Sequence, residues 1–109
     1  MVQTSEGLDC PTLKAMKVIG GKWKIPIIFN LSQKTHRFGE LKRSLCPAEG
    51  SITQQMLSKQ LKELEDDHML KRKVFAEVPP RVEYSLTEKG RQVLPVITAL
   101  YNWSTKHLA

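Results

Sequence analysis

The residues with the clearest potential to bind another molecule lie between positions 54 and 62. This stretch carries amide, hydroxyl and ammonium groups on Gln54, Gln55, Ser58, Lys59 and Lys62. At helical spacing, another side of the same stretch is an apolar stripe of Met56, Leu57, Leu61 and Leu64. The DNA major groove admits one helix, whose polar side chains can hydrogen-bond base edges and phosphates. The pattern therefore predicts a helix that contacts double-stranded DNA.

Further polar and basic side chains could hold the DNA by its phosphates. The candidates are Arg37, Lys42 and Arg43 before this helix, Ser51 and Thr53 at its start, and Lys73 and Arg81 after it. Contacts from Lys and Arg to the backbone, or in the adjacent minor groove, give affinity with little sequence information. The basic run 71–73 could equally be a solvated face, so both interpretations of that run stay open.

The sequence lacks the patterns on which catalysis or metal binding depends. No nucleophile is paired with a base, no carboxylates form a catalytic pair, and Gly20-Gly21 lacks the flanking pattern of a phosphate-binding loop. His36, His68 and His107 have no metal-ligand spacing, and we expect them on the solvated surface. The sequence therefore predicts a protein without enzyme activity, cofactor or metal site.

Composition favours one folded domain with a polyanionic partner. The chain has 109 residues, enough for one hydrophobic core, and 40% of them are hydrophobic. Lys and Arg number 17 against 11 Asp and Glu, which gives a formal charge of +6. No stretch approaches the roughly 20 apolar residues that span a bilayer, and residues 1–7 are polar. We therefore expect a cytoplasmic protein with no membrane partner and with reduced cysteines.

Apolar periodicity predicts four helices in the first two thirds of the chain. Their expected ranges are 12–19, 22–31, 38–45 and a fourth from about 51 or 53 to about 67. Gly20 and Gly21 end the first helix, and Pro26 is tolerable near the first turn of the second. The start of the fourth helix has two solutions, because Ser51 could form a capping box with Gln54 or Thr53 could be the N-cap.

After residue 69 the apolar period changes from helical to alternating. Val74, Ala76 and Val78 form one alternating set, and Val82, Tyr84 and Leu86 form another. Pro79 and Pro80 lie between the two sets, where a missing amide donor breaks no strand pairing. The sequence thus predicts a hairpin, followed by a last helix that Thr87 caps and Pro95 bends.

This order of elements predicts a mainly α fold with a small β-hairpin wing (α+β), the winged helix-turn-helix. One domain would occupy residues 1–109, with the helix-turn-helix at about 38–67 and the wing at about 70–87. The last helix would cover about 88–107. A winged-helix module that binds protein or RNA is the alternative, and an apolar face on the fourth helix would favour it. The polar face at 54–62 favours DNA instead.

Four motifs follow one another along the chain: Asp9-Cys10-Pro11, residues 19–23 (IGGKW), residues 37–41 (RFGEL) and residues 78–87 (VPPRVEYSLT). Together they resemble the signatures of HxlR-type regulators over nearly the whole chain. The resemblance implies a bacterial transcriptional regulator, commonly a repressor, that binds a palindromic operator. It also implies a homodimer formed by the first helix, about 8–20, and the last. The chain departs from the family pattern at His68, where Gly is frequent, and at Pro26.

The resemblance also gives Cys10 a potential role. Some members of the family sense oxidants or electrophiles through the cysteine of the Asp-Cys-Pro motif, which Cys10 matches. A thiolate near a helix start and close to Lys14 would have a lowered pKa, and its modification at a dimer interface could change the spacing of the two DNA-binding helices. The alternative is a small apolar residue packed at that interface. Cys46 is expected to be an ordinary buried thiol.

Overall fold

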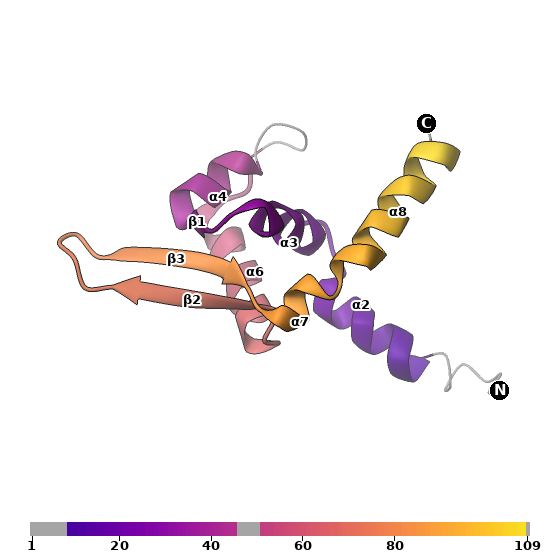
Figure 1. The fold of residues 1–109 in the computed structure, drawn as a ribbon, viewed down its shortest axis with the longest axis horizontal. Coiled ribbons are helices and arrows are strands. Elements are labelled where there is room, and N and C mark those ends of the chain that lie inside the picture. The colour runs from indigo at the N-terminus through magenta and orange to yellow at the C-terminus, as the bar shows by residue number, and fades with distance from the viewer. Residues whose placement is uncertain (1–8, 46–50, 109) are drawn as a thin grey trace.

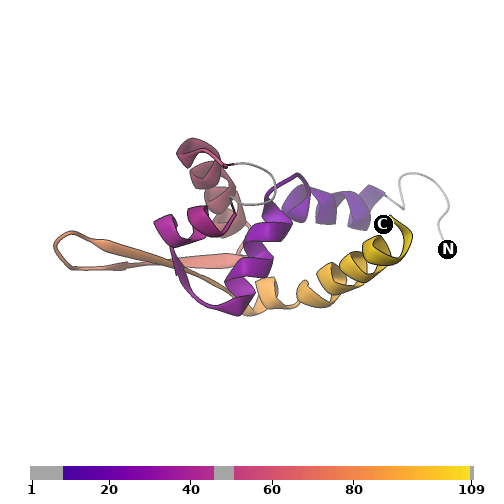
Figure 2. The same cartoon turned by 90° about the horizontal axis from the view of Figure 1, so that it is seen from above.

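The computed structural model describes residues 9–45 and 51–108, with side chains from residue 11 onward. The molecule is elongated, with extents of 56 × 31 × 23 Å. Helices form its centre, a β-hairpin projects from one end, and two helices lie at the other end (Figures 1 and 2). Within the described residues, no helix is long and apolar enough to cross a membrane.

The N-terminal part consists of a short π-helical turn and two α-helices. The turn, η1, covers Asp9–Leu13 and leads directly into α2, Lys14–Ile19, which is followed by α3, Lys24–Gln33. Helix α2 ends where Gly20 turns to an extended backbone and Gly21 takes a positive φ of 94°. Pro26 lies in the first turn of α3, as predicted, where its missing N–H breaks no helical hydrogen bond.

The helix-turn-helix pair is formed by α4, Phe38–Ser44, and α6, Gln54–Asp66. Thr53 is the N-cap of α6, because its hydroxyl accepts a 3.0 Å hydrogen bond from the Met56 N–H. This settles the choice between Ser51 and Thr53. Met56 was wrongly assigned to the apolar stripe, since its side chain is 37% exposed. It lies about 100° around the helix from Leu57, beyond the edge of the buried face.

Three antiparallel strands form a sheet in the order β1-β3-β2. They are β1, His36–Arg37; β2, Leu70–Phe75; and β3, Arg81–Leu86. The predicted hairpin is therefore present and gains a third strand from the extended piece before α4. The prediction for the first strand of the hairpin, which is β2, extends too far along the chain, because β2 ends at Phe75 and Val78 is fully exposed. Pro79 and Pro80 have no N–H to donate, so the chain leaves the ladder before them.

The core lies where α3, α6 and the sheet meet. Its members include Ile27, Ile28, Leu31, Leu41, Leu57, Leu61, Leu64, Leu70, Tyr84 and Leu86. His36 was expected on the surface, but it is buried, and its Nδ1 lies 2.9 Å from the Lys34 carbonyl oxygen. The reason is that pairing of β1 with β3 sets His36 opposite the buried Tyr84.

The C-terminal segment is two helices instead of one bent helix. Thr87 caps α7, Glu88–Arg91, by accepting a 3.0 Å hydrogen bond from the Gly90 N–H. A turn at Gln92 and Val93 separates α7 from α8, Leu94–His107. Pro95 therefore lies in the first turn of α8, where proline is compatible with a helix, and the predicted bend is a complete break.

Candidate nucleic-acid interface

The first half of α6 presents polar and cationic groups without a carboxylate. Gln54, Gln55, Ser58 and Lys59 are all exposed, and the first turn contains no acidic residue. Every acidic side chain of α6 lies in its second half, at Glu63, Glu65 and Asp66. The hydrogen-bonding face that the sequence predicted is therefore present at the end of the helix that recognition helices direct toward base edges.

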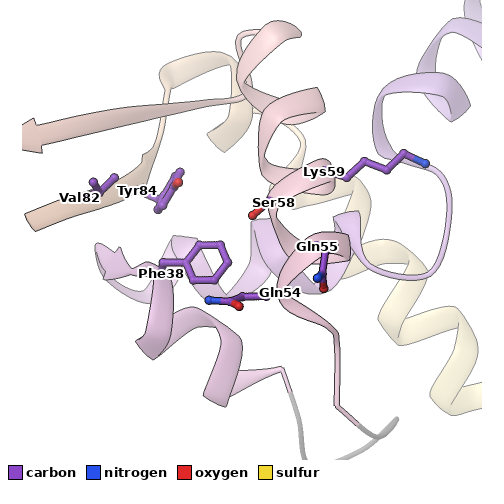
Figure 3. A pocket seen from close by; sticks show the side chains of 7 residues that line it. All are labelled: Phe38, Gln54, Gln55, Ser58, Lys59, Val82 and Tyr84. Carbon is purple, nitrogen blue, oxygen red and sulfur yellow. The ribbon is translucent and has the colours of Figure 1, made fainter.

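A groove separates this face from strand β3. Its volume is about 790 Å³, and it is lined by Phe38, Gln54, Gln55, Ser58, Lys59, Val82 and Tyr84. Figure 3 shows Gln54 and Ser58 on the side of α6 near Phe38, whereas Lys59 extends away from the strand. The groove thus lies between the polar face of α6 and strand β3 of the hairpin.

Lys62 lies one turn further along α6 and is already paired. Its Nζ is 2.8 Å from Asp66 Oδ1, and both side chains are exposed. The hydrogen bond to this carboxylate raises the pKa of the Lys62 ammonium. Asp66 therefore competes with any phosphate for this group.

The cations at the two ends of α4 do not themselves line the groove. Arg37 is exposed at the N-cap of α4, and its backbone N–H donates a 2.8 Å hydrogen bond to Glu40 Oε1. This backbone hydrogen bond lowers the pKa of the Glu40 carboxyl. Lys42 and Arg43 occupy the last turn of α4, the first half-buried and the second exposed. Neither residue lines the groove.

Strand alternation divides the basic residues of the hairpin between two faces. One face of the hairpin is directed toward the core and the groove. It carries Leu70, Arg72 and Val74 of β2 and their partners Leu86, Tyr84 and Val82 of β3. Lys71, Lys73 and Phe75 lie on the other face with Arg81 and Glu83. Lys73 and Arg81 are therefore on the sheet face that points away from α6.

An ordered cluster surrounds Phe75 on that outer face. The guanidinium carbon of Arg81 lies 3.9 Å from the ring centroid, and Lys73 Nζ lies 4.9 Å from it. Arg81 also pairs with Glu77 at 3.0 Å. Its Nε is 3.5 Å from Glu83 but makes no hydrogen bond. Arg81 thus orders the hairpin as well as supplying a cation near its tip.

Arg72 belongs to the run 71–73, for which the sequence left a phosphate contact and a solvated face open. It lines a recess of about 140 Å³ together with Ser58, Leu61, Lys62, Glu65 and Tyr84. The run 71–73 was treated as one block, but the apolar residue at position 70 marks the inward face. Alternation from Leu70 would have singled out Arg72.

No group of three or more His, Cys, Asp or Glu residues in the described ranges 9–45 and 51–108 could hold a metal ion. Cys46 lies outside the described residues, and the described side chains begin after Cys10.

A helix-turn-helix with an exposed polar second helix and a three-stranded wing defines the winged helix class of DNA-binding regulators. Residues 18–109 match the HxlR-like helix-turn-helix family. The chain belongs to this family, and it is a transcriptional regulator with a helix-turn-helix DNA-binding fold.

Individual relatives agree with this assignment. The regulator BH0655 of Halalkalibacterium halodurans, itself uncharacterized, is 47% identical over 91% of this chain and 85% of its own length. The solved structure of the HTH-type regulator ytcD is similar with a TM-score of 0.82 and 43% identity, over 90% of this chain and 96% of that one. The solved structure of the redox regulator HypR in its oxidized form is similar with a TM-score of 0.79 and 43% identity, over 90% of this chain and 97% of that one.

Proposed function

We propose that this regulator binds a palindromic operator in double-stranded DNA as a homodimer and represses transcription. Helix α6 enters the major groove of the DNA. The wing, at about residues 70–87, contacts the DNA backbone or the adjacent minor groove. The observation that carries the proposal is the carboxylate-free first half of α6, whose exposed amides, hydroxyl and ammonium border a groove shared with the wing.

Each site residue has a proposed task. Gln54, Gln55, Ser58 and Lys59 contact base edges, because they lie on the first two turns of α6. Phosphate contacts come from Arg37, Lys42, Arg43, Ser51, Thr53, Lys62 and Lys73. Arg81 can reach a phosphate by exchanging Glu77 for it, which leaves the guanidinium over Phe75.

An uncovered apolar surface supports the homodimer. Helix α8 extends from the core at the end opposite the wing, with η1 and α2 at the same end (Figures 1 and 2). Trp103 is 53% exposed, and Leu100, Tyr101, Leu13 and Met16 are also exposed. Apolar surface of this kind on a small domain marks an association surface. We therefore assign dimerisation to residues of about 8–20 and 88–107.

A thiol response is part of the proposal. Cys10 belongs to the turn that leads into α2, within the proposed dimer surface. The structural relative HypR is a redox regulator, which supports an oxidant or electrophile as the effector. Replacement of Cys10 by Ser should abolish any loss of DNA binding on treatment with oxidant; unchanged oxidant sensitivity would remove Cys10 from this role.

The test of the DNA-binding face compares two glutamines on one helix. Gln60 lies about 140° around α6 from Gln55 and donates a 3.3 Å hydrogen bond to Met56 Sδ. We expect Gln55→Ala to weaken binding to the operator in fluorescence-anisotropy titrations, while Gln60→Ala leaves it unchanged. Equal effects of the two substitutions would contradict a role for this face of α6. Tighter binding of the wild type to RNA than to duplex DNA would favour the RNA-binding alternative.

A further inference from the structure

The recess beside Arg72 connects the wing to α6 and has the size of a small anion site. Its volume of about 140 Å³ is well below the roughly 300–1,000 Å³ of pockets for drug-sized ligands. Ser58 and Tyr84 line both this recess and the larger groove, so the two adjoin. An anion in the recess would therefore lie next to whatever occupies the groove.

The recess is lined by two cationic side chains and by a hydroxyl, the groups that bind a tetrahedral anion. Arg72, in the middle of β2, is opposite Tyr84 and shares its sheet face. Ser58 and Lys62 line the recess from α6, and an anion would share the Lys62 ammonium with Asp66, whose Oδ1 lies 2.8 Å from Nζ. The guanidinium fork matches the geometry of phosphate oxygens, and the hydroxyl can donate to a third oxygen.

We propose that this recess is a phosphodiester subsite, occupied by the DNA strand that leaves the major groove toward the wing. The inference rests on the proposed DNA binding and adds Arg72 to the residues that perform it. Contacts of this kind set position and affinity, and they carry no sequence information directly.

Glu65 gives the proposal a second, independent consequence. Glu65 lines the same recess, and a carboxylate there would repel a phosphate. Removal of this charge should therefore tighten DNA binding. If Arg72 and Glu65 served only to join β2 to α6, Glu65→Gln would lower the free energy of unfolding and would not tighten binding.

Lys71 provides a matched control for Arg72. It is the neighbouring cation on the same strand but lies on the opposite sheet face, across from Ser85. Anisotropy titrations over about 50 to 200 mM salt would use the protein's own promoter duplex and an unrelated duplex of equal length. The plot of log K against log salt has a negative slope, and each lost phosphate contact makes it shallower by about 0.9. Arg72→Ala should therefore make the slope shallower by about 1.8 in a dimer, which has two copies of the site. Affinity should fall by the same factor on both duplexes.

The outcomes separate the subsite from the proposed function. Lys71→Ala should have a salt slope nearer that of the wild type than Arg72→Ala has. Arg72→Lys should keep the wild-type slope but bind more weakly. Glu65→Gln should bind both duplexes more tightly. An unchanged slope for Arg72→Ala, equal slopes for Arg72→Ala and Lys71→Ala, or no gain for Glu65→Gln would overturn the subsite while DNA binding stands. Failure of the wild type to bind any duplex would instead overturn the proposed function.

Discussion

The ion pair between Lys24 and Glu63 should show a strong asymmetry when its partners are removed one at a time. Lys24 Nζ lies 2.7 Å from Glu63 Oε1, and the pair joins α3 to the second half of α6. The Lys24 side chain is only 8% exposed, whereas that of Glu63 is 41% exposed. Lys24 Nζ also lies 3.5 Å from the Lys17 carbonyl oxygen near the end of α2. The pair therefore links α6 to the N-terminal helix through a buried ammonium.

The magnitude follows from which charge is left behind. Breaking a fully buried pair costs about 3–5 kcal/mol, because one charge stays buried without a partner. Glu63→Ala leaves the buried Lys24, but water can enter on the exposed Glu63 side, so we expect about 2 kcal/mol. Lys24→Met keeps the packing of the side-chain stem and leaves a carboxylate that water can solvate, so we expect at most about 1 kcal/mol. The double variant should cost no more than Lys24→Met alone.

Urea unfolding at neutral pH and at one fixed protein concentration measures these differences. Additive costs for the two substitutions, or a greater cost for Lys24→Met than for Glu63→Ala, would refute the reasoning. Acid gives a further check, because the hydrogen bond from Lys24 lowers the pKa of Glu63 from its ordinary 4.5. A lowered folded-state pKa contributes stability that is complete above the unfolded value and is lost as pH falls through the folded value. The difference between the wild type and Glu63→Gln should therefore shrink below about pH 4.5.

Four further substitutions test local features of the fold by thermal or urea unfolding. Thr53→Ala should cost about 1 kcal/mol through loss of the α6 N-cap, and Ser51→Ala should cost almost nothing; the reverse order would contradict the cap assignment. His68 has a positive φ of 61°, so His68→Gly should stabilise by up to about 1 kcal/mol, and a loss of stability would show that the ring makes a compensating contact. A Cβ on Gly90 would collide with the Met69 carbonyl oxygen, so Gly90→Ala should cost about 3 kcal/mol, and wild-type stability would disprove this close packing.

Much of the helical architecture could be predicted from the sequence, because apolar spacing reports which helix face is buried. Helices α3, α4 and α6 lie within two residues of their predicted limits at most ends. The alternating residues 82, 84 and 86 likewise marked β3. Local patterns of this kind need no knowledge of the tertiary fold.

Features that depend on contacts between distant residues could not be predicted in the same way. The burial of His36 results from its pairing with Tyr84 across the sheet. The full break before Pro95 directly follows α7, which is linked to the end of α6 by the 2.9 Å hydrogen bond that Lys89 donates to the Asp67 carbonyl oxygen. These contacts join segments that lie far apart in sequence.

The candidate site was predictable in its helix but not in its wing. The polar face of α6 follows from side-chain spacing alone, whereas the division of the wing cations between two faces depends on strand register. Arg81 illustrates the difference, because its contacts with Phe75 and Glu77 appear only once the hairpin is folded. Sequence charge identified a basic wing and could not tell which cations point toward α6.

Equilibrium titration of the wild-type protein on its own promoter duplex and on an unrelated duplex, at one fixed salt concentration, tests the central claim most directly. We predict promoter binding at least about a thousandfold tighter than binding to the unrelated duplex, as expected when base-edge contacts add to phosphate contacts. Equal affinity for the two duplexes would contradict sequence-specific DNA recognition by α6.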